Sequence, residues 1–243
     1  MTVWSNKSIA KDLRDFARVL KSHQADILFD VDRLEELSCQ IPELDYCEIE
    51  KFEIEFYGRK PLSGMYPEIR NFKISLSNSV SSNPDLSSSE IDPIKNFTFD
   101  LVIIGFCKHE VGKTFINCWH LDKNIKEQHD GEQKYTHPLY HFQFGGNRLN
   151  EMKTSGDILL MGAPRIPHPP MDLFLSIHFI LNNYFNKKDS DYLYLNGLFA
   201  DYEYRRILKN AKQRMWYPYF DALRSDHNTN NALNLASLFP LAV

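Results

Sequence analysis

Strict alternation of apolar and charged residues in one stretch constrains the fold of this 243-residue chain more than any other feature. Across residues 50–57, the apolar side chains are Phe52, Ile54 and Phe56, and charged residues stand between them. A period of two places the two sets on opposite faces of a β-strand, so one face is buried and the other is in water. NFKISL, residues 71–76, repeats the pattern, and the turn-rich GRKPLSGMYPE between the stretches predicts a hairpin.

Further strands follow along the chain. FTFDLVIIGF, residues 97–106, is apolar on both faces, which is typical of a central strand, and KTFINCWHL after Gly112 predicts a second hairpin. The serine-rich residues 77–93 between the hairpins predict a mobile loop, because sheet signals resume directly after them. THPLYHFQFGG, residues 136–146, and DILLMGA, residues 157–163, are two more strand candidates, giving about six in all.

Amphipathic helices are predicted at both ends of the chain. A helix capped by Ser5 or Ser8 carries an apolar stripe on one side, and a second stripe follows over residues 27–37. MDLFLSIHFILNNYF predicts an apolar helix with Pro169 or Pro170 in its first turn, after an extended PRIPHPP segment. We therefore expect an α+β fold: an antiparallel β-meander with N-terminal helices and a C-terminal helical region packed on it.

The expected domain organisation is one α+β core domain over residues 1–189, with a flexible serine-rich loop at 77–94. Residues 190–243 are expected to form a helical extension packed on this core.

Composition excludes several classes of protein. The net charge of −4 and the pI near 6.1 give no overall attraction to nucleic acid, so such binding needs a local basic patch. Four cysteines without a CxxC pair indicate reduced thiols in the cytosol. The charged N-terminus is unlike a signal peptide, and the sequence has no apolar run long enough to cross a membrane. We expect a cytoplasmic protein without a membrane partner.

Seven of the nine histidines fall between positions 109 and 178, which invites a metal hypothesis. On one continuous strand, His137 and His141 would point the same way but lie about 13 Å apart, too far for one zinc ion. His141 and Gln143 share a strand face, while the neighbouring aromatic residues would face the core. The pair His141 and Gln143 is therefore either hydrogen-bonded structure or the floor of a polar cleft.

Two other segments carry candidate chemistry. His168 and Asp172 can meet at the start of a helix, either as a general base beside a carboxylate or as a simple cap for free backbone amides. Arg165 could bind an anion or pair with an acid. In WHLD, His120 and Asp122 share a strand face at good ligand spacing, and Cys118 lies on that face too, so these residue types would suit zinc.

A basic and aromatic segment, YRRILKNAKQRMWYPYF, lies near the C-terminus. Its cations could contact a nucleic-acid backbone or a partner subunit, or form a solvated helix face. The cations are Arg205, Arg206, Lys209, Lys212 and Arg214.

Two resemblances follow from these segments. Through THPLYHFQFGG, APRIPHPPMDLFLSIHFILNNYF and RMWYPYF, residues 97–220 resemble uncharacterised bacterial proteins encoded near toxin–antitoxin or phage-defence genes. This resemblance implies a genomic setting and assigns no catalytic residue. The order of a helix, a four-strand meander, a His-Pro step and further helices is similar to ubiquitin-conjugating enzymes. No cysteine nucleophile follows His137-Pro138 here, so conjugating activity is not expected.

Three functional hypotheses remain open. The first is an accessory or binding subunit, with a protein partner or as a homo-oligomer, in a bacterial anti-phage defence or toxin–antitoxin system. The second is a metal-dependent hydrolase or nuclease that uses His141, His168 and Asp172, with zinc or manganese as its cofactor. The third is nucleic-acid binding through the C-terminal basic segment. For the first two, the working surface also includes His137, Gln143 and Arg165.

Overall fold

The computed structural model describes residues 3–59, 68–84, 92–124, 137–145, 166–224, 233 and 235–239. Its centre is one six-stranded antiparallel sheet in which every strand pairs with the next along the chain. The strands are β1 (Glu48–Gly58), β2 (Ile69–Ser82), β3 (Ile94–Cys107), β4 (Thr114–Lys123), β5 (Tyr140–Phe144) and β6 (Ile166–Pro167). The predicted α+β meander is confirmed.

The helices come before and after the sheet in sequence. Before it are α1 (Asn6–Ser22), a short 3-10 helix (Ala25–Ile27) and α2 (Asp32–Gln40); after it are α4 (Leu173–Tyr184), a second 3-10 helix (Ser190–Tyr192), α5 (Tyr194–Ala200), α6 (Tyr202–Arg224) and α7 (Leu235–Leu238). Ser5 caps α1, since its hydroxyl accepts a hydrogen bond from the Ser8 amide at 3.2 Å.

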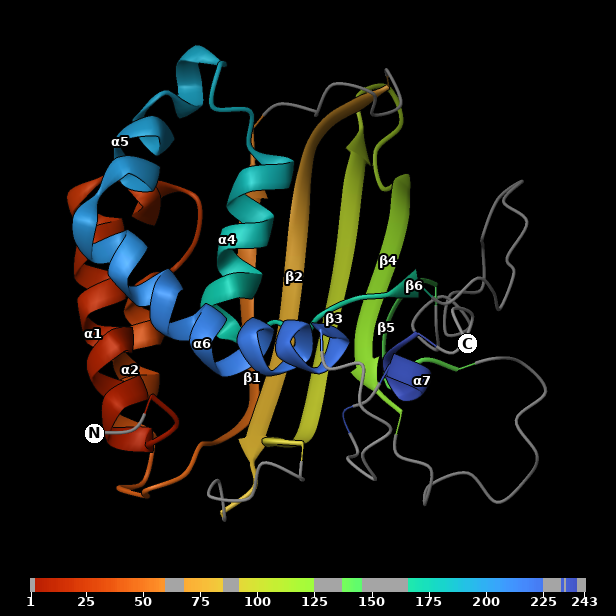
Figure 1. Ribbon diagram of the computed structural model, residues 1–243. Coiled ribbons are helices and arrows are strands. Elements are labelled where there is room, and N and C mark those ends of the chain that lie inside the picture. The colour runs from red at the N-terminus through yellow and green to blue at the C-terminus, as the bar shows by residue number, and fades with distance from the viewer. Residues whose placement is uncertain are drawn as a thin grey trace.

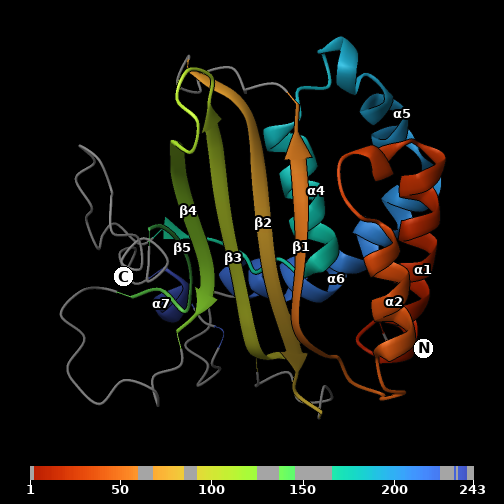
Figure 2. The same ribbon diagram turned by 180° about the vertical axis from the view of Figure 1, so that it is seen from behind.

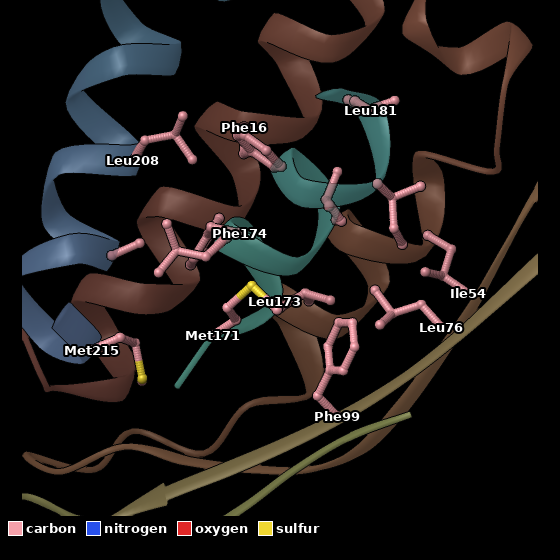
Figure 3. Close-up of a cluster of buried hydrophobic side chains, with 14 of the residues drawn as sticks. Phe16, Ile54, Leu76, Phe99, Met171, Leu173, Phe174, Leu181, Leu208 and Met215 are labelled. Carbon is pink, nitrogen blue, oxygen red and sulfur yellow. The ribbon is translucent and has the colours of Figure 1, made fainter. Parts of the chain in front are cut away.

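The helices gather on one side of the sheet. α4 lies over β2, and α1 and α6 pack against each other beyond it (Figure 1). The core between α4 and the strands is apolar, with Phe99, Leu76 and Ile54 pointing towards Leu173 and its neighbours (Figure 3). Seen from behind, β1 to β4 have no described helix in front of them (Figure 2). We call this side of the sheet the open face.

Strand alternation decides which residues reach the open face. Phe52, Ile54 and Phe56 are buried under the helices, as predicted, so Glu53 and Glu55 lie on the open face. The same rule, carried across the strand pairs, places Asp100 of β3 on the open face. β3 is central as predicted, but its open-face residues from Val102 onwards are half-exposed.

Two predicted boundaries differ from the structure, and one predicted strand cannot be compared with it. β2 continues to Ser82 and β3 begins at Ile94, so residues 77–82 and 94 of the predicted loop are strand. Its serines were misleading, because they alternate with buried Leu76 and Val80 and are accommodated on the open face. The sixth strand is β6, whereas the candidate at 157–163 lies outside the described residues. α4 begins at Leu173, three residues after the prolines predicted for its first turn.

Residues 202–224 pack closely on the predicted core. The guanidinium of Arg206, on α6, donates to Asp12 at 3.0 Å and to Asp15 at 3.1 Å on α1. Asn78 of β2 donates to the Met171 carbonyl at 3.1 Å, which holds the start of α4 on the sheet. The division of the chain at residue 189 stays a prediction, but these contacts join both sides of it.

Candidate functional site

Three potential metal ligands converge on the open face where β4 meets β5. His120 and Asp122 lie two residues apart on β4, and His141 of β5 pairs directly with Asp122. One ligand atom from each of these residues lies within 4.8 Å of the others. The sequence predicted that His120 and Asp122 share a face; the strand register adds His141.

Short contacts surround the ring of His141. Its Nε2 lies 2.9 Å from Oδ1 of Asp122 and 3.1 Å from Nε2 of His137. Nε2 of His120 lies 3.9 Å from Oδ2 of Asp122. The expectation that His137 lies about 13 Å from His141 is wrong, because β5 begins at Tyr140 and His137 precedes the strand, so its ring turns back onto His141.

The hydrogen bonding of this cluster is incomplete. His141 is 2% exposed, and its Nδ1 has no hydrogen-bond partner among the described residues. Oδ1 of Asp122 is also buried and makes no well-aligned hydrogen bond, although it lies close to His141. Because buried polar atoms nearly always have a partner, Oδ1 of Asp122 is available to an ion or a water.

Electrostatics keep the carboxylate of Asp122 ionised. Burial by itself would raise the pKa of Asp122, but the adjacent His141 and the nearby imidazoles of His120 and His137 outweigh it and lower the pKa. An ionised carboxylate beside imidazoles is the donor set that a divalent transition metal prefers. Gln143 pairs with His120 and lies on the same open face of the sheet. Cys118 is not one of the three converging ligands.

His168 does not join this cluster. Its ring packs against Phe142, with centroids 5.5 Å apart, and its Nδ1 lies 2.7 Å from the Pro169 carbonyl oxygen. Phe142 and His141 alternate on β5, so the two imidazoles lie on opposite faces of the sheet. Burial lowers the pKa of His168.

Asp172 is a structural cap. Its Oδ1 accepts from the Leu175 amide at 3.1 Å, and its Oδ2 accepts from two nitrogens of Arg214. The structure therefore does not bring His141 together with His168 and Asp172, and Asp172 caps α4, as the second of the two predicted alternatives has it.

The C-terminal basic segment is divided between the interior and the surface. Arg214 is buried, and Arg206 pairs with acids of α1, so neither presents its charge to a nucleic acid. Lys209 and Arg205 are exposed, and Lys212 lies over the Trp216 ring at 5.2 Å. Arg165 lies outside the described residues.

Comparisons with known proteins give no further assignment. No family model, curated protein or solved structure matches the chain. Among the described residues, no helix is both long and apolar enough to span a membrane.

Proposed function

We propose that this protein is a metal-dependent hydrolase in which His120, Asp122 and His141 bind one zinc ion on the open face. The convergence of these ligand atoms within 4.8 Å carries the proposal. Two imidazoles and one carboxylate are a common catalytic zinc set, in which three protein ligands leave a position open for water. Zinc supplies hydrolytic chemistry by lowering the pKa of bound water to about 7.

The chain supplies both access and a proton acceptor. The Asp122 side chain is 43% exposed, so water and a substrate can reach the cluster from the open face. His137 touches His141 through Nε2, and metal binding at His141 would break that contact. We assign His137 the role of general base, since it would then lie beside the reacting water. The ionised carboxylate of Asp122 would offset part of the positive charge of the zinc ion.

Elemental analysis of purified protein tests the metal site. We expect one zinc per chain in the wild type and in His109→Ala, an exposed histidine outside the cluster, but little in Asp122→Asn or His141→Ala. The proposed site is contradicted if the wild type takes up no zinc, or if Asp122→Asn contains as much zinc as the wild type. If the protein contains iron instead of zinc, the assignment of the metal ligands stands but the proposed hydrolase activity is overturned. Two histidines and one carboxylate also hold ferrous iron in oxygenases.

A hydrolysis assay tests the reaction class. We expect the zinc-loaded protein to hydrolyse p-nitrophenyl acetate, to lose this activity with a chelator and to regain it with zinc. His137→Gln should lower the rate about 100-fold or more while zinc stays bound, since general bases contribute on that scale. If His137→Gln hydrolyses p-nitrophenyl acetate at the wild-type rate, His137 is not the general base.

A binding subunit is the second candidate function. The open face of β3 and β4 carries half-buried apolar side chains, among them Val102, Ile104 and Ile116, which favour a protein partner or a second copy. Ile104→Glu should then lower the mass of the assembly measured in solution. A defence or toxin–antitoxin setting stays a prediction from resemblance alone.

A further inference from the structure

A groove on the open face leads towards the proposed metal site. It has a volume of about 590 Å³, which is in the range of small-molecule sites, and it runs from the start of α2 across β1, β2 and β3. Four carboxylates line it, from Asp30, Glu53, Glu55 and Asp100, together with the guanidinium of Arg33.

One row of residues across the sheet connects the groove to the metal ligands. Glu53 pairs with Ser77, Ser77 with Asp100, and Asp100 with His120, so all four side chains lie side by side on the open face. Neighbouring strands are about 4.8 Å apart, which places Glu53 about 14 Å from His120. A ligand a few residues long can therefore reach from the groove to the metal site.

Ser77 indicates that the groove is built to hold a ligand. Its side chain lines the groove, and the residue is only 8% exposed. Its hydroxyl makes no hydrogen bond within the part of the chain that the structure describes, and it is not fully enclosed, so a ligand in the groove can reach it. A ligand with N–H donors would complete the hydrogen bonding of Ser77.

The carboxylates already bind ammonium groups of this chain. Lys51 lies 2.6 Å from Glu53, and Lys73 lies 2.8 Å from Glu55. Hydrogen bonds from Lys73 and Tyr57 lower the pKa of Glu55, so its carboxylate is ionised. Solvent-exposed ion pairs of this kind contribute little to stability, so a ligand ammonium can replace the lysines at little cost.

We infer that the groove binds a ligand carrying ammonium or guanidinium groups, such as a peptide segment containing lysine or arginine, and presents it to the site at His120. The presentation of this ligand to a reaction rests on the proposed function, whereas the binding of the ligand in the groove does not. The acidic lining repels a phosphate backbone, so nucleic acid is not the substrate.

Binding of fluorescently labelled trilysine to the full-length, zinc-loaded protein tests this inference. Asp100→Asn and Ser77→Ala should each weaken binding about tenfold, which corresponds to about 1.4 kcal/mol. Ser77→Ala leaves the charge unchanged, so its effect separates a built site from general attraction to an acidic protein. Glu110→Gln, in the exposed β3–β4 turn, is the matched charge control and should bind as the wild type does.

The outcomes separate this inference from the proposed function. Trilysine binding that falls in Asp100→Asn and Ser77→Ala supports the groove, whether or not zinc is found in the protein. Equal binding by the wild type and both groove variants overturns it, even if zinc is bound as proposed. Preferential binding of labelled single-stranded DNA over trilysine also overturns it.

Discussion

Arg214 and Asp172 form a buried ion pair in which Nε and Nη2 of the guanidinium donate to one carboxylate oxygen, Oδ2, at 3.2 and 2.9 Å. Nη1 of Arg214 also donates to the Val3 carbonyl at 3.1 Å and lies 3.7 Å from Asp12 of α1. One side chain that is 1% exposed thus joins the N-terminal segment, α4 and α6. It compensates the buried charge of Asp172 and adds to the pairing of Asp12 with Arg206.

Arg214→Met should lower the free energy of unfolding by about 3–5 kcal/mol, because it leaves the carboxylates of Asp172 and Asp12 without this cation. Urea denaturation measures the change. Arg224→Met, at the exposed end of the same helix, is the control and should cost less than about 0.5 kcal/mol. A comparable loss in both variants would contradict a special role for Arg214.

Stability should fall as the pH drops from about 6.5 towards 4. Burial and the nearby charges of Lys212 and Lys187 lower the pKa of His178 from 6.5 to about 4. The unfolded state therefore takes up a proton first, and the contribution of neutral His178 is lost through this window. Melting temperatures measured against pH should show the decline, and His178→Gln should reduce it. An identical pH profile for His178→Gln would show that other groups cause the decline.

Zinc should stabilise the folded protein. Free zinc at 100 times its dissociation constant adds about 2.7 kcal/mol, which raises the melting temperature of a chain of this size by about 5–10 °C. Calorimetry should find this shift in the wild type and in His109→Ala, but not in Asp122→Asn. A shift of the same size in Asp122→Asn would place the ion elsewhere.

Gly58→Ala should destabilise the β1–β2 hairpin by about 1–3 kcal/mol. A methyl group at Gly58 would lie 2.1 Å from ring atoms of Phe72, which belongs to the packed core. The loss should shrink in the background of Phe72→Leu, since the smaller side chain relieves the clash. Additive effects in this double-mutant cycle would contradict the steric explanation.

Local patterns predicted most of the fold. The alternation around Phe52 and Ile54 gave the correct faces for β1, and the apolar stripe after Ser5 gave the correct buried side of α1. These signals are strong because one face of each element must be buried. The serines of β2 conceal the same alternation, because polar residues on an open sheet face look like a loop in sequence.

The site was less predictable because it depends on pairing between distant strands. His120 and Asp122 are neighbours on β4, and their spacing was informative. Nothing local indicates that Asp122 pairs with His141, since register across a long connection is not encoded in either strand alone. For the same reason, the basic run on α6 gave no sign that Arg214 would be buried against Asp172.

The position of Arg214 also bears on how the chain is made. Asp12 and Asp172 are synthesised well before the cation that satisfies them, so while the chain is still on the ribosome both carboxylates are better left in water. Helices α1 and α4 can reach their final packing only after residue 214 has emerged, which makes completion of this layer a late step of biosynthesis.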